Sequence, residues 1–333
     1  MTSAGGVVTR RFVAPGKLMI AGEYSVLAPG GEALAVAVEG GVALDAEPAP
    51  AWELVRADSG AAWRPGAPVP GDLRFAAAAF EEVRAHLGDP GAPHRLLLRP
   101  AGAHGTGEAK PGIGGSASST AVTAAAVLTL ATGVAPVNPL LLDVALRAHR
   151  RAQDGEGSGY DVATVVYGGL VHWRHGEATR LPWPDGLHLL AGYSGTSART
   201  TSFLAKVEAL RAADPARLAD DFGALAAPVR ALVDAFRTAA PAAALDAARA
   251  CHRALAAWDA AHRLGIVTPA IAQLCAAAER AGAAAKVSGA GGGDSVIAFA
   301  GAAAVLEAVS RAWTSAGFRP LPLVRAEAGT REA

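Results

Sequence analysis

Apolar residues recur every three or four positions between residues 111 and 133, which is the spacing of one helix face. Small side chains hold many of these positions, among them Ala117, Ala121 and Ala124. Gly133 follows as a stop signal, because glycine readily adopts the left-handed conformation that ends many helices. The pattern predicts an alanine-rich helix that begins just after a cluster of glycines.

The remaining hydrophobic pattern predicts a mixture of helices and strands. Helical spacing covers residues 75–87, 138–153 and 302–315, and the block 203–282 is helical with breaks near residues 215, 241 and 265. Short apolar runs predict strands at residues 12–14, 18–21, 33–44, 95–99, 170–174, 187–194, 283–288, 295–300 and 320–326. Asn138 is expected to cap the helix that Pro139 opens.

Composition limits the possible classes of protein. The 333 residues are 51% hydrophobic, and 30 Lys and Arg balance 30 Asp and Glu. A net charge of zero argues against a broad nucleic-acid or acidic-membrane surface. Cys251 and Cys275 lie in helical sequence and show no metal-ligand spacing, which fits a reducing compartment. With neither a signal peptide nor a transmembrane segment in view, we expect a cytoplasmic monomer or homodimer that binds no membrane and no nucleic acid.

The glycine cluster before the predicted helix is typical of an anion site. A glycine-rich loop brings the backbone close to a ligand, and the helix start offers unpaired N–H groups with partial positive charge. Phosphate is the usual anion at such a place. The alternative is an ordinary loop before a buried helix.

Two further side chains have a structural and a chemical interpretation. Lys17 follows Pro15-Gly16 in an apolar context, where it is either a turn lysine at the surface or a point charge at a site. Asp161 follows a glycine-rich acidic loop, where it is either a helix N-cap or a catalytic carboxylate that faces the phosphate loop. Neither the common P-loop pattern nor a dinucleotide turn is present, since residues 289–293 lack the required glycine spacing and precede a strand.

Three glycine-containing stretches together resemble the three motifs of the GHMP kinases, the superfamily of galactokinase, homoserine kinase, mevalonate kinase and phosphomevalonate kinase. Residues 14–17 with 22–24 resemble the first motif, residues 111–117 the ATP-phosphate motif, and residues 286–294 the third. Residues 148–163 and 192–202, together with Gly22-Glu23-Tyr24, most resemble the phosphomevalonate kinases within it.

The resemblance implies an α+β fold of two domains. Residues 1–182 would form a ribosomal-protein-S5-like, ATP-binding N-terminal domain with an unusual left-handed crossover. Residues 183–333 would form a ferredoxin-like C-terminal domain extended by helices.

It also implies phosphoryl transfer from ATP with Mg²⁺ to phosphomevalonate. Asp161 matches the catalytic aspartate, Lys17 the lysine that favours its ionised form and holds the acceptor, and Ser116 the hydroxyl that binds Mg²⁺ or phosphate. The implied nucleotide contacts are Lys110, Pro111, Gly112, Ile113, Gly114, Gly115, Ser116, Ala117 and Ser118. The implied acceptor contacts are Glu23, Tyr24, Ser158, Ser197, Arg199, Thr200, Thr201, Gly289, Ala290, Gly291 and Gly292.

Two positions depart from the family pattern. Gly115 stands where the ATP motif usually has its first serine, and Arg150 stands where mevalonate kinases carry a metal-binding glutamate. The second departure argues against a mevalonate kinase and leaves the second magnesium ligand open. Another small-molecule GHMP kinase and a non-catalytic ligand sensor also stay open as functions, although a sensor has no need of both Lys17 and Asp161.

Overall fold

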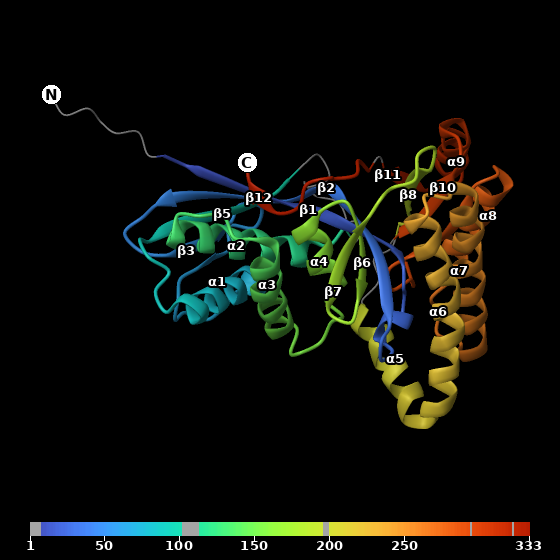
Figure 1. The fold of residues 1–333 in the computed structure, drawn as a ribbon, viewed down its shortest axis with the longest axis horizontal. Helices are drawn as coiled ribbons and strands as arrows, with labels where there is room; N and C mark the ends of the chain where they lie inside the picture. Colours follow the sequence, from blue (N-terminus) through green and yellow to red (C-terminus); the bar gives the residue numbers. More distant parts are fainter. Residues whose placement is uncertain (1–7, 102–112, 196–199, 294, 322) are drawn as a thin grey trace.

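The computed structural model describes residues 8–101, 113–195, 200–293, 295–321 and 323–333. Within these ranges the chain forms two units side by side, one built on an eight-stranded sheet and the other on a four-stranded sheet (Figure 1). Each unit has an apolar core of its own, and a third apolar cluster, which includes Ile20, Phe236 and Phe299, joins the two units.

The first sheet is organised around one long strand, β2. This strand has 17 residues and pairs with β1 along most of its length, with β5 at its C-terminal end and with β6 at its N-terminal end. The strand order is β12-β1-β2-β5-β3-β4, with β6 on β2 and β7 on β6. The strands are β1 (Arg10–Ala21), β2 (Glu32–Pro48), β3 (Glu53–Arg56), β4 (Ala62–Trp63), β5 (His94–Pro100), β6 (Leu170–Arg174), β7 (Glu177–Leu181) and β12 (Arg331–Glu332).

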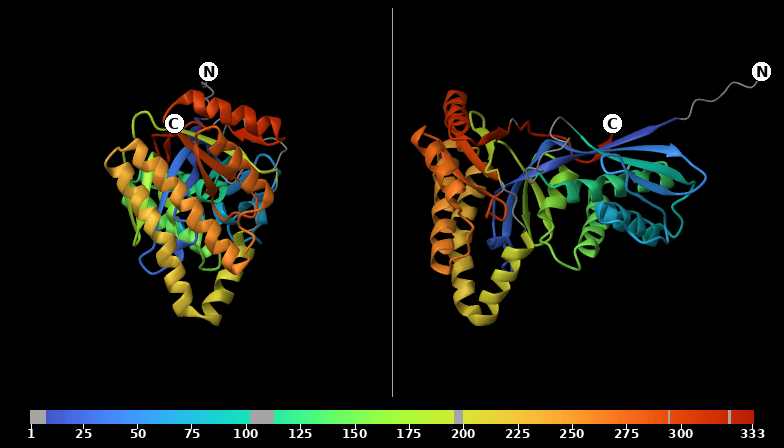
Figure 2. Two further views of the ribbon diagram at one scale, coloured as in Figure 1. Left: turned by 90° about the vertical axis from the view of Figure 1, so that its right-hand side faces the viewer. Right: turned by 180° about the vertical axis from the view of Figure 1, so that it is seen from behind.

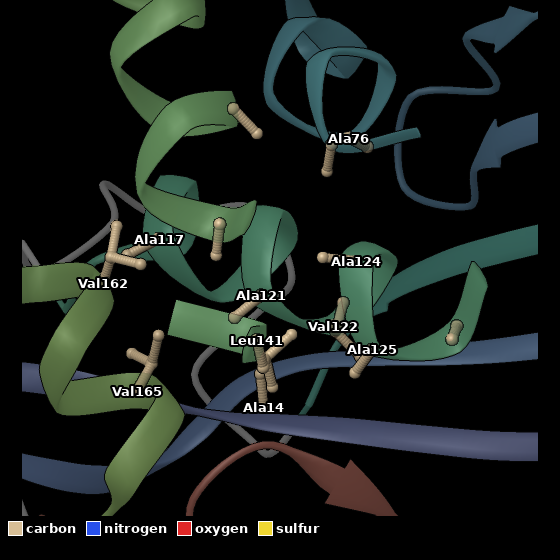
Figure 3. Packing of buried hydrophobic residues seen from close by; sticks show 14 of the residues in the cluster. Ala14, Ala76, Ala117, Ala121, Val122, Ala124, Ala125, Leu141, Val162 and Val165 are labelled. Carbon is tan, nitrogen blue, oxygen red and sulfur yellow. The ribbon is translucent and has the colours of Figure 1, made fainter. Parts of the chain in front are cut away.

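The helices of this unit pack on one another and on one face of the sheet (Figures 1 and 3). They are α1 (Arg74–Leu87), α2 (Gly115–Thr132), α3 (Asn138–Ala152) and α4 (Tyr160–Tyr167), and short 3-10 helices η1 (Ser25–Leu27) and η2 (Gly71–Leu73) connect strands to their neighbours. The central helix α2 is buried all round from Ala117 to Thr129, because its small side chains let the other elements approach closely. Gly133 ends α2 with a φ of 74°, as predicted.

The second unit combines an antiparallel sheet of order β11-β8-β10-β9 with five helices (Figure 2). Its strands are β8 (His188–Tyr193), β9 (Ala284–Ser288), β10 (Ser295–Ala300) and β11 (Arg319–Leu321). Its helices are α5 (Thr200–Ala213), α6 (Pro215–Arg237), α7 (Pro241–His262), α8 (Pro269–Arg280) and α9 (Ala303–Ser315). The predicted breaks near residues 215, 241 and 265 are confirmed, and prolines at the first helical position begin α6 and α7.

Three local predictions differ from the structure. Strand β7 was not predicted, and the predicted strand at 320–326 is only Arg319–Leu321. Asn138 does not cap α3: the helix starts at Asn138 itself, and the N-cap is Val137, which makes no side-chain cap bond. The Asn138-Pro139 pair therefore predicted the start of α3 correctly, but it did not predict that Val137 is the N-cap residue.

The end of the chain returns to the first unit. The N–H of Glu39 donates to the carbonyl of Val324 at 2.9 Å, and the N–H of Thr330 donates to the carbonyl of Val165 at 2.9 Å. Strand β12 then pairs with β1 beside Phe12 and Val13. The predicted boundary between residues 182 and 183 lies in the connection from β7 to β8, and it stays a prediction. No helix within the described ranges is long and apolar enough to cross a membrane.

Candidate active site

A cavity of about 530 Å³ is lined by both units of the molecule. The first unit contributes residues of β1, the start of α2 and the start of α4, including Lys17, Ser116 and Asp161. The second unit contributes the loop that follows β9, including Gly289 and Ala290. The segments that carried the family resemblance therefore meet around one cavity.

The helix α2 begins at this cavity. Gly114 precedes it with a φ of 81°, which favours glycine, and a Cβ there would lie 2.8 Å from Cγ of Lys17 and would displace that side chain. Ser116 lines the cavity in the first turn of α2. The N–H groups of a first turn have no acceptor within their own helix, so they are available to an anion.

Three expected nucleotide contacts, Ile113, Ala117 and Ser118, make structural contacts within the protein, and their contact with a nucleotide stays a prediction. The hydroxyl of Ser118 is fully buried and lies 2.6 Å from the carbonyl oxygen of Pro15, to which it donates. Ala117 is buried in the core, and the carbonyl of Ile113 accepts the N–H of Lys17 at 2.8 Å. These residues position the loop against β1. The expected contacts Lys110, Pro111 and Gly112 lie outside the described residues and stay predictions.

The side chain of Lys17 reaches Tyr160, the first residue of α4. Its Nζ lies 3.5 Å from the phenol oxygen and 5.5 Å from the ring centroid. Burial raises the pKa of the Tyr160 phenol, and the nearby Lys17 cation offsets part of that rise. Tyr160 is therefore a neutral hydroxyl close to Lys17, and it directly precedes Asp161 in sequence. The sequence analysis did not identify it.

Asp161 is not the N-cap of α4. That position belongs to Gly159, whose φ is 87° and where a Cβ would lie 2.6 Å from Cδ2 of Leu146. Asp161 lies in the first turn, and its Oδ1 accepts the N–H of Val162 at 2.9 Å. A carboxylate in the first turn is stabilised by the partial positive charge of the helix start. Of the two interpretations of Asp161, the N-cap is thus wrong, and the catalytic one stays open.

A stack of side chains from α1 and α3 lies behind Asp161. Nε2 of His149 is 3.7 Å from Oδ2 of Asp161, and the His149 ring stacks on Phe75 with centroids 5.0 Å apart. The guanidinium carbon of Arg74 lies 4.6 Å from the Phe75 ring centroid, and Arg74 lines the cavity. No local signal could have identified this stack, because it forms only when three helices pack together.

Strand β9 and the loop that follows it are both bonded to the first unit. Lys286 is fully buried, and its Nζ donates to Oε1 of Glu23 at 2.5 Å. The hydroxyl of Tyr24 donates to the carbonyl of Ala290, and burial raises the pKa of that phenol. Glu23 and Tyr24 line the cavity as expected, but their polar groups already have partners within the protein. Their contact with substrate stays a prediction.

The predicted acceptor residues divide into three groups. Ser158, Gly289 and Ala290 line the cavity. Gly291 and Gly292 are not among its lining residues: a Cβ on them would lie 2.4 Å from Cγ2 of Ile266 and 2.3 Å from Cζ of Phe203, respectively. Ser197 and Arg199 lie outside the described residues, and Thr200 and Thr201 begin α5 with side chains that the structure does not describe.

Comparison with known proteins gives matches along the whole chain. The model of the GHMP kinases N terminal domain matches residues 74–169, and that of the GHMP kinases C terminal domain matches residues 232–317. The phosphomevalonate kinase of Streptomyces sp. (strain CL190) is 31% identical over 378 residues, which cover 99% of this chain and 100% of that protein.

Solved structures share the fold at lower identity. A Listeria innocua protein has a TM-score of 0.88 and 22% identity, with 98% of this chain and 99% of that chain covered. The Streptococcus pneumoniae phosphomevalonate kinase in complex with phosphomevalonate and AMPPNP has a TM-score of 0.81 and 20% identity, with 96% and 99% covered. Mevalonate kinases also share this fold, so the fold alone does not select an acceptor. The resemblance and the two-domain α+β fold that it implied are confirmed, and this chain belongs to the GHMP kinase family.

Proposed function

We propose that this protein transfers the γ-phosphoryl group of ATP to the phosphate of 5-phosphomevalonate, which gives 5-diphosphomevalonate and ADP. The observation that carries the proposal is the meeting of Lys17, Asp161 and the start of α2 around one cavity. The Streptomyces phosphomevalonate kinase, which is related over its full length, supports this choice of acceptor. The pneumococcal relative, which binds phosphomevalonate together with AMPPNP, supports it as well.

The reaction needs the two substrates held in line and their negative charge neutralised. An oxygen of the acceptor phosphate forms a bond to the γ-phosphorus while the bond from that phosphorus to the β–γ bridging oxygen breaks. The first-turn amides of α2 would bind the nucleotide phosphates. Lys17 would hold the acceptor oxygen, and Asp161 would orient the acceptor and accept whatever proton it still carries.

The donor set of the cavity fits Mg²⁺. Ser116, Asp154, Glu156 and Asp161 all line it and offer oxygen ligands. Magnesium in phosphotransferases is usually held by one or two carboxylates, the remaining ligands being phosphate oxygens and water. Ser116 would hold the ion, which supplies positive charge to the terminal phosphates when bound.

The side chains around the cavity carry more negative than positive charge, so binding an anionic acceptor requires the positive charge of Mg²⁺. Glu23 is neutralised by the buried Lys286, which leaves the carboxylates of Asp154, Glu156 and Asp161 against the cations of Lys17 and Arg74. Arg74 is the cation that the structure adds to the sequence-based set. Lys110 and Arg199, which lie outside the described residues, are the further cations that the motifs place near the two substrates.

The direct test is an ATP-consumption screen over mevalonate, phosphomevalonate, homoserine and galactose. We expect phosphomevalonate to be strongly preferred, because a site built to pair a phosphate leaves its donors unpaired when an analogue lacks that group. Each unpaired buried donor costs about 1–3 kcal/mol. A higher kcat/KM for mevalonate, homoserine or galactose would reject the acceptor and retain the kinase. No ATP turnover with any of the four would reject the proposal as a whole.

A further inference from the structure

The ring nitrogen of His149 that faces Asp161 is buried without a hydrogen-bond partner among the described residues. His149 is 2% exposed, and its Nε2 makes no hydrogen bond within the part of the chain that the structure describes. An unpaired buried polar atom costs stability, and a bond to a nearby acceptor would remove that cost. The nearest charged atom that the structure records for it is Oδ2 of Asp161, at 3.7 Å.

The two oxygens of Asp161 are held differently. Oδ1 accepts the N–H of Val162 at 2.9 Å, which fixes one end of the carboxylate on its own helix. Oδ2 lies 3.7 Å from Nε2 of His149, which is too far for a hydrogen bond. A normal N–H···O distance is about 2.9 Å, so the two atoms would have to approach by about 0.8 Å. A small shift of the imidazole and the carboxylate toward each other would close such a gap. Catalytic hydrogen bonds are often long without substrate and tighten when the substrates bind.

The surroundings hold the imidazole in place for this contact. Its ring stacks on Phe75 at a centroid distance of 5.0 Å and an interplanar angle of 29°. His149 lies in the last turn of α3, where helix carbonyls favour positive charge, and Asp161 lies in the first turn of α4, where N–H groups favour negative charge. The donor and the acceptor thus come from helix ends of complementary polarity.

We propose that His149 is a positioning residue, whose Nε2–H donates to Oδ2 of Asp161 when the substrates are bound and so fixes the carboxylate toward the acceptor. His149 itself touches no substrate in this arrangement. The inference rests on the proposed kinase reaction, since it assigns a role through Asp161.

The test compares two substitutions. His149→Phe keeps the ring and the stack on Phe75 but removes the donor, whereas His149→Gln keeps an N–H near the position of Nε2. For His149→Phe we expect a fall in kcat of roughly 10-fold to 10²-fold, the scale on which a misplaced catalytic group slows a reaction. The KM values for ATP and acceptor should stay near wild type. The melting temperature should be equal or higher, because an unpaired buried nitrogen is lost. His149→Gln should restore most of the rate.

The decisive control is the same change in an Asp161→Asn background. If His149 acts through Asp161, His149→Phe adds little further loss there, because residues that act as a unit are not additive. A full further loss in that background would overturn the inference. So would a wild-type kcat for His149→Phe, or a lowered melting temperature, which would assign the nitrogen to the fold. If the wild-type protein phosphorylates none of the acceptors in the screen, the proposed function is rejected. That result is distinct from a failure of the His149 variants to behave as expected.

Discussion

The two glycine-rich loops at the cavity use their glycines differently. In the loop before α2, Gly114 turns the chain into the helix, and Gly115 has no described heavy atom within 4 Å of the place where a Cβ would stand. In the loop after β9, Gly291 and Gly292 leave room for Ile266 and Phe203 to pack against the backbone. The N–H of Gly292 is also occupied, since it donates to the carbonyl of Ile266 at 2.7 Å. Gly115 of the first loop thus faces open space, whereas Gly291 and Gly292 of the second loop are packed against other parts of the protein.

The sharpest way to test this difference is to add a methyl group to the packed loop. Gly292→Ala places a Cβ 2.3 Å from Cζ of Phe203 at a φ of 71°. Left-handed backbone and overpacking together predict a loss of about 2–5 kcal/mol in the free energy of unfolding, measured by denaturant titration. Gly289→Ala is the matched control, because it has a φ of 88° but no described atom within 4 Å. Equal losses in the two variants would show that packing against Phe203 does not matter.

For Asp161, which lines the cavity, we expect the reverse: a large change in rate without a change in stability. Asp161→Asn should lower kcat by roughly 10²-fold, as loss of a positioned acid or base does, and leave the melting temperature and ATP binding nearly unchanged. Asp214→Asn is its control, since Asp214 also accepts a backbone N–H at a helix start, from Arg217, but lies on α6 away from the cavity lining. If Asp161→Asn turned over at the wild-type rate, Asp161 would have only a local structural role.

A smaller effect is expected at the start of α2. Ser116→Ala should raise the KM for Mg-ATP by about 10-fold, the scale of one lost hydrogen bond to a charged group, and change the KM for the acceptor much less. Steady-state assays with each substrate varied in turn separate the two constants. An effect on the acceptor alone would place Ser116 on the other side of the cavity.

The smallest effect is expected for a substitution at Gly115, in the loop before α2. Gly115→Ser adds a side chain to space that no described residue fills, so the stability should change by no more than about 0.5 kcal/mol. Because the new hydroxyl restores the residue usual in the family motif, binding of an ATP analogue by calorimetry should be equal or tighter. Gly114→Ala, whose Cβ would lie 2.8 Å from Cγ of Lys17, should weaken binding instead. A large loss of stability in Gly115→Ser would mean that this loop is packed as tightly as the other.

Elements with a strong local signal could be predicted from the sequence. The alanine period of α2 and the prolines that begin α6 and α7 depend only on residues within a few turns, and all three helices were found where expected. The segments of the site could be predicted as well, since the family motifs bring Lys17, Ser116 and Asp161 to one cavity.

Features that depend on distant parts of the chain could not be predicted. Strand β12 has two residues and acquires its pairing only beside β1, more than 300 positions earlier. The stack of Phe75 on His149 needs α1 and α3 in contact, and although His149 lies in a segment that resembles the family, that segment does not indicate Phe75 as its partner. The packing of Gly291 and Gly292 could not be predicted either, because Ile266 and Phe203, which pack against them, lie elsewhere in the chain.

The return of the C-terminal segment to the first unit has a consequence for folding during synthesis. A ribosome releases β1 and β2 early, but residues 324–332, which bond to Glu39, Val165 and β1, emerge only after the second unit has been made. The close approach at Gly329, where a Cβ would lie 2.0 Å from the carbonyl oxygen of Val166, shows how tightly this late segment is inserted. Until then part of β1 is an open sheet edge that another nascent chain can pair with. The unit whose strands are made first is therefore completed only after the helices and strands of the second unit have been made.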